Sequence, residues 1–155
     1  MLQRVQTLFL LFAVLSTSAL LTNLMVLATV EGDLTLLKAM PNSMLDDGIF
    51  HVTDHLLLLV LVGAGILLSL ISIFQFRHRN QQVTLVRLAL IANLMIIILA
   101  GLFFYQDYKN LTSGVYVFDI EYGVLAPILS IILCILAIRY IHKDEKLVRS
   151  MDRLR

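Results

Sequence analysis

Four long stretches of this chain contain no Asp, Glu, Lys, Arg or His. They cover residues 5–28, 56–76, 88–105 and 123–138. A helix of roughly 20 apolar residues crosses the ~30 Å hydrocarbon core of a bilayer, and each stretch approaches or reaches that length. We therefore predict an all-α membrane protein, a bundle of four transmembrane helices at about residues 5–28, 56–76, 85–105 and 123–141.

The composition of the chain supports the same class. Hydrophobic residues make up 59% of it and charged residues only 15%, whereas about a quarter of the residues in soluble domains are charged. The spans leave room for two outer loops, residues 29–55 and 106–122, and for a tail, residues 142–155. We expect residues 1–155 to form a single transmembrane domain.

Basic and acidic residues are unevenly divided between the two ends of the predicted bundle. The tail and the turn between the second and third spans hold most of the Lys and Arg, while the predicted outer loops hold most of the Asp and Glu. Because Lys and Arg concentrate on the cytoplasmic side, we predict cytoplasmic N and C termini and loops on the opposite side. A net charge of +1 gives no reason to expect nucleic acid. The first stretch is longer than the ~7–15 residues of a signal-peptide core, so we expect a retained helix.

Small and polar residues within the spans indicate where the helices pack. Gly65, Ser69 and Ser72 recur at helical spacing and form one narrow stripe, which lets a neighbouring backbone approach closely. Counted from Arg87, Asn93 lies only about 9 Å along its helix, at the predicted depth of Ser69, Ser72 and Cys134. We expect Asn93 to form hydrogen bonds with side chains at that depth. Asn23 lies about 27 Å along the first helix, and we expect water or loop backbone near the outer surface to satisfy it.

The chemical groups that most membrane enzymes and coupled transporters need are missing from the four uncharged stretches. The chain has one cysteine, Cys134, so a single chain cannot build a disulfide or a paired-thiol relay. No carboxylate or basic side chain lies in the four stretches, although cation-coupled transport usually requires one. We expect neither an enzyme nor a bound cofactor.

One weak metal-site candidate lies at the outer end of the second span. His51 and His55 are four residues apart with Asp54 beside them, which is a ligand set suited to zinc or copper if a helix carries both histidines on one face. The alternative, which we favour, is a solvated helix start with Asp54 as a capping residue. We therefore expect no metal.

The second outer loop contains a strand-like segment at residues 115–122, which is rich in aromatic and β-branched side chains. It could pair with residues 34–40 or 49–52 of the first loop and form a small β element that closes the outer end. The tyrosines around it then form much of an interfacial belt. These are Tyr105, Tyr108, Tyr116 and Tyr122.

The chain ends in KDEKLVRSMDRLR, for which we predict a short basic amphipathic helix. Leu147, Met151 and Leu154 share one face of such a helix. The helix can lie on anionic lipid headgroups or dock on another membrane protein. The residues we expect to bind a partner are Lys146, Leu147, Arg149, Met151, Arg153, Leu154 and Arg155.

Three segments of the chain resemble a known family: the opening MLQRVQTLFLLFA, the turn FRHRNQQVTLVRL and the ending KDEKLVRSMDRLR. Together they resemble a small family of four-pass inner-membrane proteins of Bacteroidota, a domain of unknown function family (4293). The resemblance covers essentially the whole chain. It implies a location in a bacterial inner membrane with periplasmic loops, and it implies no activity or catalytic residue.

These observations favour a non-enzymatic accessory or structural subunit of a larger membrane protein complex, serving for example protein translocation, secretion or envelope biogenesis. An alternative is a small-molecule or ion carrier with a polar cavity near Asn93, Ser69 and Ser72. A third is a metal- or lipid-dependent membrane enzyme that uses His51, Asp54 and His55. The partners we expect are the lipid bilayer and other integral membrane proteins.

Overall fold

The computed structural model describes residues 2–22, 25–31, 48–75, 78–110 and 117–152 of the chain. This part contains four α-helices: α1 (Leu2–Ala19), α3 (Leu56–Phe74), α4 (Arg79–Asn110) and α5 (Leu125–Asp152). Three short strands accompany them: β1 (Ala28–Glu31), β2 (Ile49–Phe50) and β3 (Val117–Ile120). Two single 3-10 turns precede helices, η1 (Val52–Asp54) before α3 and η2 (Tyr122–Val124) before α5.

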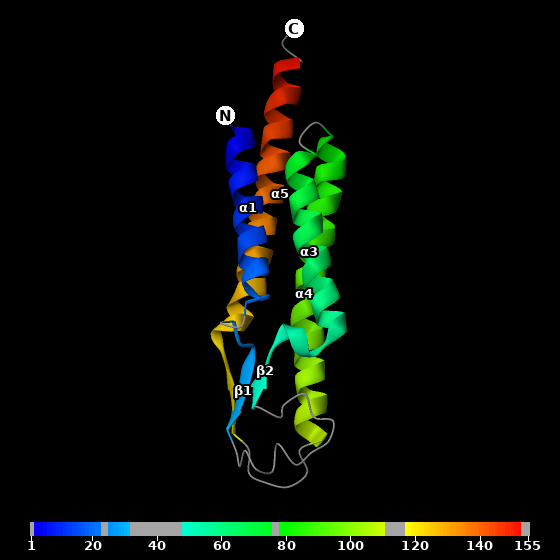
Figure 1. Ribbon diagram of the computed structural model, residues 1–155. Helices are drawn as coiled ribbons and strands as arrows, with labels where there is room; N and C mark the ends of the chain where they lie inside the picture. Colours follow the sequence, from blue (N-terminus) through cyan, green and yellow to red (C-terminus); the bar gives the residue numbers. More distant parts are fainter. Residues whose placement is uncertain (1, 23–24, 32–47, 76–77, 111–116, 153–155) are drawn as a thin grey trace.

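The helices form one elongated bundle. α1 packs against α5 and α3 against α4, and further contacts join α4 to α5 and α1 to α3, so each helix has two neighbours. Both chain termini lie at the same end of the bundle, and the sheet lies at the opposite end (Figure 1). We call these the terminal end and the sheet end.

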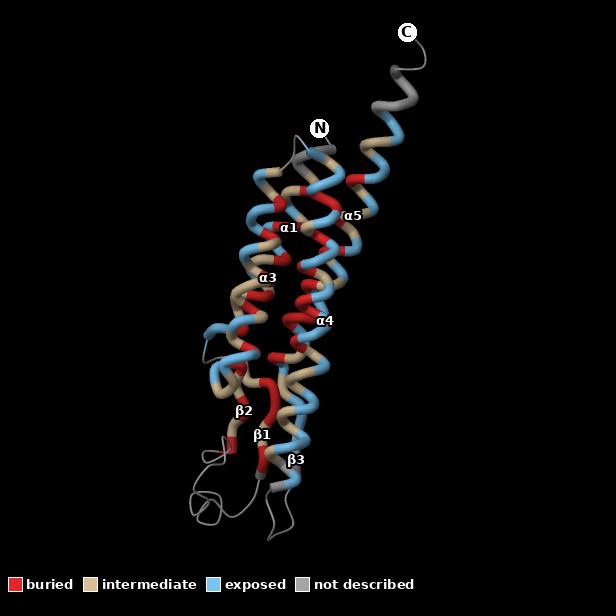
Figure 2. Tube along the Cα trace, turned by 90° about the vertical axis from the view of Figure 1, so that its right-hand side faces the viewer, coloured by how far each residue is buried: buried red, intermediate tan, exposed pale blue. Residues whose placement is uncertain are grey.

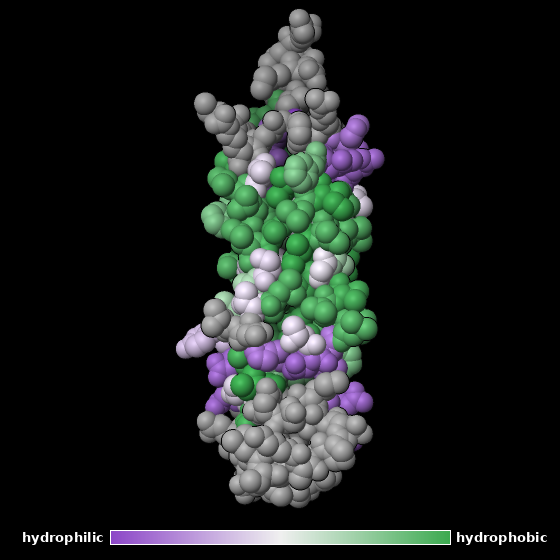
Figure 3. Space-filling model, in the orientation of Figure 1, coloured by the Kyte–Doolittle hydropathy of each residue, from purple (hydrophilic) through white to green (hydrophobic). Residues whose placement is uncertain are grey.

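An apolar belt surrounds the middle of the bundle. Among the described residues, three helices are long and apolar enough to cross a membrane, with candidate spans Leu56–Phe74, Arg79–Asp107 and Tyr122–Leu147. A shorter apolar helical segment, Val5–Ala19, lies beside them. Figure 3 shows hydrophobic side chains over the middle of the molecule, with hydrophilic ones gathered toward both ends. The described chain therefore has the surface of a helical membrane protein.

The first apolar stretch serves two elements, which corrects the prediction of one helix over residues 5–28. α1 ends at Ala19, and the chain turns before it enters β1 at Ala28. Leu27 and Val30 are each 4% exposed, because the sheet buries them against the bundle. An apolar run has the same composition in a membrane helix and in a buried strand, so composition alone could not locate this boundary.

The tail continues the last helix, which corrects the prediction of a separate C-terminal helix. α5 runs for 28 residues without interruption, a length of about 42 Å. Figure 2 shows its last turns projecting past the other helices at the terminal end. Residues 153–155 lie outside the described part.

The sheet has the order β2-β1-β3, with both pairs antiparallel. Ala28 lies opposite Phe50 on one side and opposite Ile120 on the other. The predicted strand at residues 115–122 is thus confirmed for β3, but its predicted direct pairing with residues 49–52 is wrong, because β1 lies between them. The other predicted partner, residues 34–40, lies outside the described residues.

Two groups of buried apolar residues hold the bundle together. One lies at the sheet end, where Phe50, Val52 and Leu58 pack with Ile96 of α4. The other lies toward the terminal end, around Leu10, Val86 and Ile141. The polar residues described next separate the two groups.

Candidate interaction surfaces and the polar centre

A hydrogen-bonded polar centre joins the helices between the two apolar groups. The Thr17 hydroxyl of α1 lies 3.2 Å from Oδ1 of Asn93 on α4 and 2.9 Å from the hydroxyl of Ser130 on α5. Thr17 Oγ1 also lies 2.9 Å from its own helix carbonyl at Ala13. The Asn93 amide nitrogen donates to the Ala89 carbonyl at 2.9 Å. Thr17, Asn93 and Ser130 are at most 1% exposed.

Gly65 of α3 supplies the fourth side of this centre. A Cβ built on Gly65 would lie in ordinary van der Waals contact with Asn93 Nδ2 at 3.6 Å and Thr17 Cγ2 at 3.8 Å, so Gly65 faces both polar residues. Along the same face of α3, Ser69 and Ser72 are also buried. Ser72 reaches the Gln82 carbonyl at 3.5 Å, while the Ser69 hydroxyl has no hydrogen-bond partner among the described residues.

The partners of Asn93 differ from the predicted ones. We expected Ser69, Ser72 or Cys134, and the structure gives Thr17 and Ala89 instead. Arg87 does not mark the start of this helix, because α4 begins at Arg79. Counted from Arg79, Asn93 lies about 21 Å along α4, and Thr17 lies about 22 Å along α1. Matching polar residues by depth from the true helix starts would have found Thr17. Asn23 lies outside the described residues.

At the sheet end, a close backbone contact joins the chain before β1 to the start of α5. Gly123 N–H donates to the Val26 carbonyl at 2.9 Å, and Glu121 N–H donates to the Leu27 carbonyl at 3.1 Å. A Cβ on Gly123 would overlap the carbonyl group of Val26. Pro127 follows in the first turn of α5, where an N–H has no partner within the helix.

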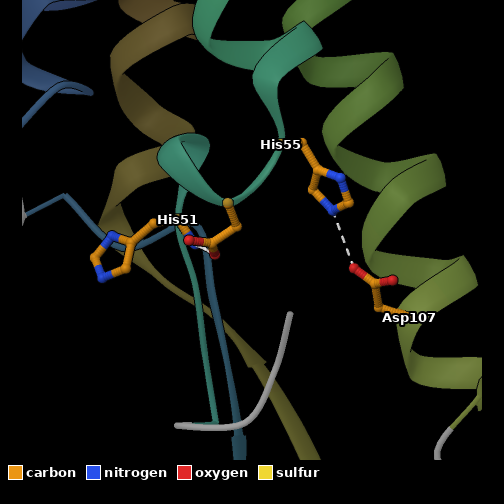
Figure 4. A network of polar contacts seen from close by, with 4 residues as sticks. His51, His55 and Asp107 are labelled. Carbon is orange, nitrogen blue, oxygen red and sulfur yellow. Dashed lines mark hydrogen bonds and ion pairs between the residues drawn. The ribbon is translucent and has the colours of Figure 1, made fainter. Parts of the chain in front are cut away.

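An imidazole and a carboxylate join α3 to α4 beside the sheet. His55 Nε2 lies 3.0 Å from Asp107 Oδ2, and both side chains are largely buried. The His55 ring stacks on Phe103, with ring centroids 4.4 Å apart and planes 13° apart. His55 thus links the start of one helix to the last turns of its neighbour (Figure 4).

The three weak metal candidates do not converge. His51 and His55 flank η1 in extended conformations, so the shared helix face that their spacing suggested is not formed. The His51 ring points away from His55, and Asp54 accepts the His51 backbone N–H at 2.6 Å (Figure 4). No group of three His, Cys, Asp or Glu side chains that could hold a metal ion occurs among the described residues.

Of the predicted tyrosine belt, two side chains are described and both are exposed at the sheet end. Tyr105 is 65% exposed and Tyr122 is 79% exposed. The side chains of Tyr108 and Tyr116 lie outside the described part.

At the terminal end, acidic and basic side chains of α5 have different surroundings. Asp144 forms an ion pair with Arg79 of α4 at 3.1 Å, and Glu145 lies 3.7 Å from His142. Lys143, Lys146 and Leu147 are exposed. Arg149 and Met151 continue the α5 backbone, while Arg153, Leu154 and Arg155 lie outside the described residues.

An apolar groove of about 810 Å³ runs between α1 and α5 in the half of the bundle nearer the sheet. Phe12 and Leu15 line one wall and Leu125 and Leu129 the other. A second cavity of about 230 Å³ lies where α4, α5 and the sheet meet. Neither includes Asn93, Ser69 or Ser72.

The fold and its surfaces define a class, a helical membrane-protein bundle capped at one end by a small antiparallel sheet. Within that class the chain belongs to the family of the domain of unknown function DUF4293, whose model matches residues 2–154. No curated protein and no solved structure matches the chain.

Proposed function

We propose that this protein is a non-enzymatic, four-pass accessory subunit of a larger complex in a bacterial inner membrane. α1 serves as the fourth span, because its 18 residues extend about 27 Å, close to the thickness of the hydrocarbon core. Both termini lie in the cytoplasm and the sheet lies in the periplasm. The division of basic and acidic residues between the two ends supports this orientation.

The continuation of α5 past the other helices is the observation that carries the proposal (Figure 2). Isolated short helices are marginal in water, and most helical stability in proteins comes from packing. A projecting helical end with exposed Lys146 and Leu147 is therefore suited to pack against another protein. The residues that we propose for docking are Lys146, Leu147, Arg149, Met151, Arg153, Leu154 and Arg155.

The polar centre favours this role over that of a carrier. A carrier site near Asn93 needs polar groups that a solute can reach. Both ends of the Asn93 amide are already hydrogen-bonded, and its side chain is 0% exposed. The centre is therefore suited to helix packing, where interhelical hydrogen bonds of this kind contribute about 0.6–2 kcal/mol.

A truncation tests the docking role without disturbing the bundle. A chain that ends at Glu145 keeps Asp144 and its ion pair with Arg79, but it loses all the residues proposed for docking. After crosslinking in cells and purification in a gentle detergent, the full chain should bring down stoichiometric membrane proteins and the truncated chain should not. Lys109→Gln is the matched control, since Lys109 is exposed at the other end of the bundle. Recovery of the full chain alone would contradict the proposal.

A further inference from the structure

One exposed stripe runs along most of α5 and changes from apolar to basic partway. Its members are three or four residues apart, so the helical repeat places all of them on one face. All are exposed: Ile128, Ile132, Ile135, Arg139, Lys143 and Lys146. We call this set the α5 stripe.

The acidic residues nearby lie on other faces of α5. Asp144 is turned toward α4, where it pairs with Arg79, and Glu145 lies beside His142. The helical repeat places both carboxylates well away from the α5 stripe. Among the described residues of α5, the stripe therefore presents three positive charges and no negative one.

The dimensions of the stripe match one leaflet of a bilayer. Eleven residues separate Arg139 from Ile128, a rise of about 16 Å, and half of the hydrocarbon core is about 15 Å. If Arg139 lies at the level of the headgroups, Ile135, Ile132 and Ile128 follow the acyl chains to the bilayer centre. Lys143 and Lys146 lie farther out, where long stems can bend their ammonium groups back toward a phosphate.

From this charge complementarity we propose that the α5 stripe binds an anionic phospholipid. Arg139, Lys143 and Lys146 hold the headgroup phosphate, and the isoleucines contact the acyl chains. The guanidinium of Arg139 presents a fork of donors that suits a phosphate. This inference goes beyond the proposed docking role, because it requires no protein partner and shares only Lys146 with the residues proposed for docking.

Lipid selectivity measured by electron paramagnetic resonance tests the inference. The full-length protein is reconstituted into phosphatidylcholine vesicles that carry a trace of spin-labelled phosphatidylglycerol or spin-labelled phosphatidylcholine. The fraction of motionally restricted label gives the relative affinity for each lipid. The wild type should prefer phosphatidylglycerol several-fold at low salt. The preference should fall sharply in 1 M salt, where the screening length is about 3 Å.

Substitutions then locate the site. Arg139→Gln, Lys143→Gln and Lys146→Gln together should abolish the preference, since each basic residue near an anionic surface contributes a factor of up to about five. Lys143→Arg with Lys146→Arg keeps the charge and should keep the preference. Lys109→Gln removes one charge at the sheet end and should also leave it unchanged. Circular dichroism of every variant confirms that the helices are intact.

Two results would overturn the inference. One is a wild-type protein that holds both lipids equally. The other is a triple variant that keeps the full preference; if that variant also loses co-purifying proteins, the α5 stripe is a protein-docking face. Loss of selectivity with partners retained would support lipid binding alone.

Discussion

Gly123 lies where two backbone segments meet. A substitution at this position therefore tests the junction between the sheet and α5. In Gly123→Ala the added Cβ would overlap the Val26 carbonyl, so one segment must move and the hydrogen bond from Gly123 N–H to Val26 is strained. We expect the free energy of unfolding to fall by about 1–3 kcal/mol. Unfolding in mixed micelles with increasing SDS measures the change.

Gly63 provides the matched control. It lies within α3, and a Cβ there would meet nothing within 4 Å. Alanine is the better helix former by about 0.5–1 kcal/mol, so Gly63→Ala should leave the stability unchanged or raise it slightly. Equal destabilisation by both substitutions would show that the Gly123 contact has no special role.

Thr17 is the residue through which the polar centre can be weakened most selectively. Thr17→Val keeps the shape of the side chain but removes the hydroxyl that contacts Asn93 and Ser130. Asn93 Oδ1 then loses its partner, and we expect a cost of about 1 kcal/mol. Thermal unfolding in detergent, followed by circular dichroism, should show the lower midpoint.

A second threonine separates this effect from a general effect of threonine removal. Thr84 is exposed, and its hydroxyl donates to the Asn80 carbonyl of its own helix. Thr84→Val should change the unfolding midpoint little. If Thr17→Val proves equally mild, the hydrogen bonds of the polar centre contribute nothing measurable to the stability of the bundle.

At the scale of the element, His55 and Asp107 set the relation between the start of α3 and the end of α4. Their contact is 3.0 Å long and largely buried. A double-mutant cycle with His55→Ala and Asp107→Ala should therefore give a coupling free energy of about 1 kcal/mol or more.

The control cycle pairs His55→Ala with Lys109→Ala, because Lys109 is exposed two residues farther along α4. Its coupling should lie within about 0.5 kcal/mol of zero. A His55–Asp107 coupling no larger than that of the control would mean that Phe103, rather than Asp107, positions the imidazole.

The type of each helix or strand could be predicted from the sequence more easily than the residues at which it begins and ends. Absence of charge predicted four spans, and three helices are confirmed as long and apolar enough to cross a membrane among the described residues. The β-branched and aromatic residues around Val117 correctly predicted a strand. The end of α1 at Ala19 could not be predicted, because the apolar residues after it are compatible with a buried strand as well as with a membrane helix. The uninterrupted α5 was missed for a related reason, since the charge of the tail says nothing about where a helix ends.

The candidate sites were harder to predict than the elements, because they depend on which helices are neighbours. Gly65 and Asn93 are separated by many residues in the chain but meet in one layer of the bundle. The sequence indicated that each of them packs, yet it contained no direct signal that Thr17 completes the layer. The α5 stripe depends on burial, which only the packed bundle determines.

At the scale of the whole molecule, both termini lie at one end and the sheet at the other (Figure 1), which makes the proposed orientation testable with two cysteine substitutions. Thr53 is exposed beside the sheet, and Asn80 is exposed near the start of α4 at the terminal end. Cys134 is 0% exposed, so the parent protein should react little with a membrane-impermeant maleimide.

In intact bacterial cells that express each variant, we expect the maleimide to label Thr53→Cys and to leave Asn80→Cys unlabelled. After the inner membrane is permeabilised, both variants should react, because the reagent then reaches the cytoplasmic face. The reverse pattern would place the basic end outside and overturn the orientation inferred from charge. Labelling of both variants in intact cells would indicate that the chain inserts in both orientations, which a single fixed role in a complex does not allow.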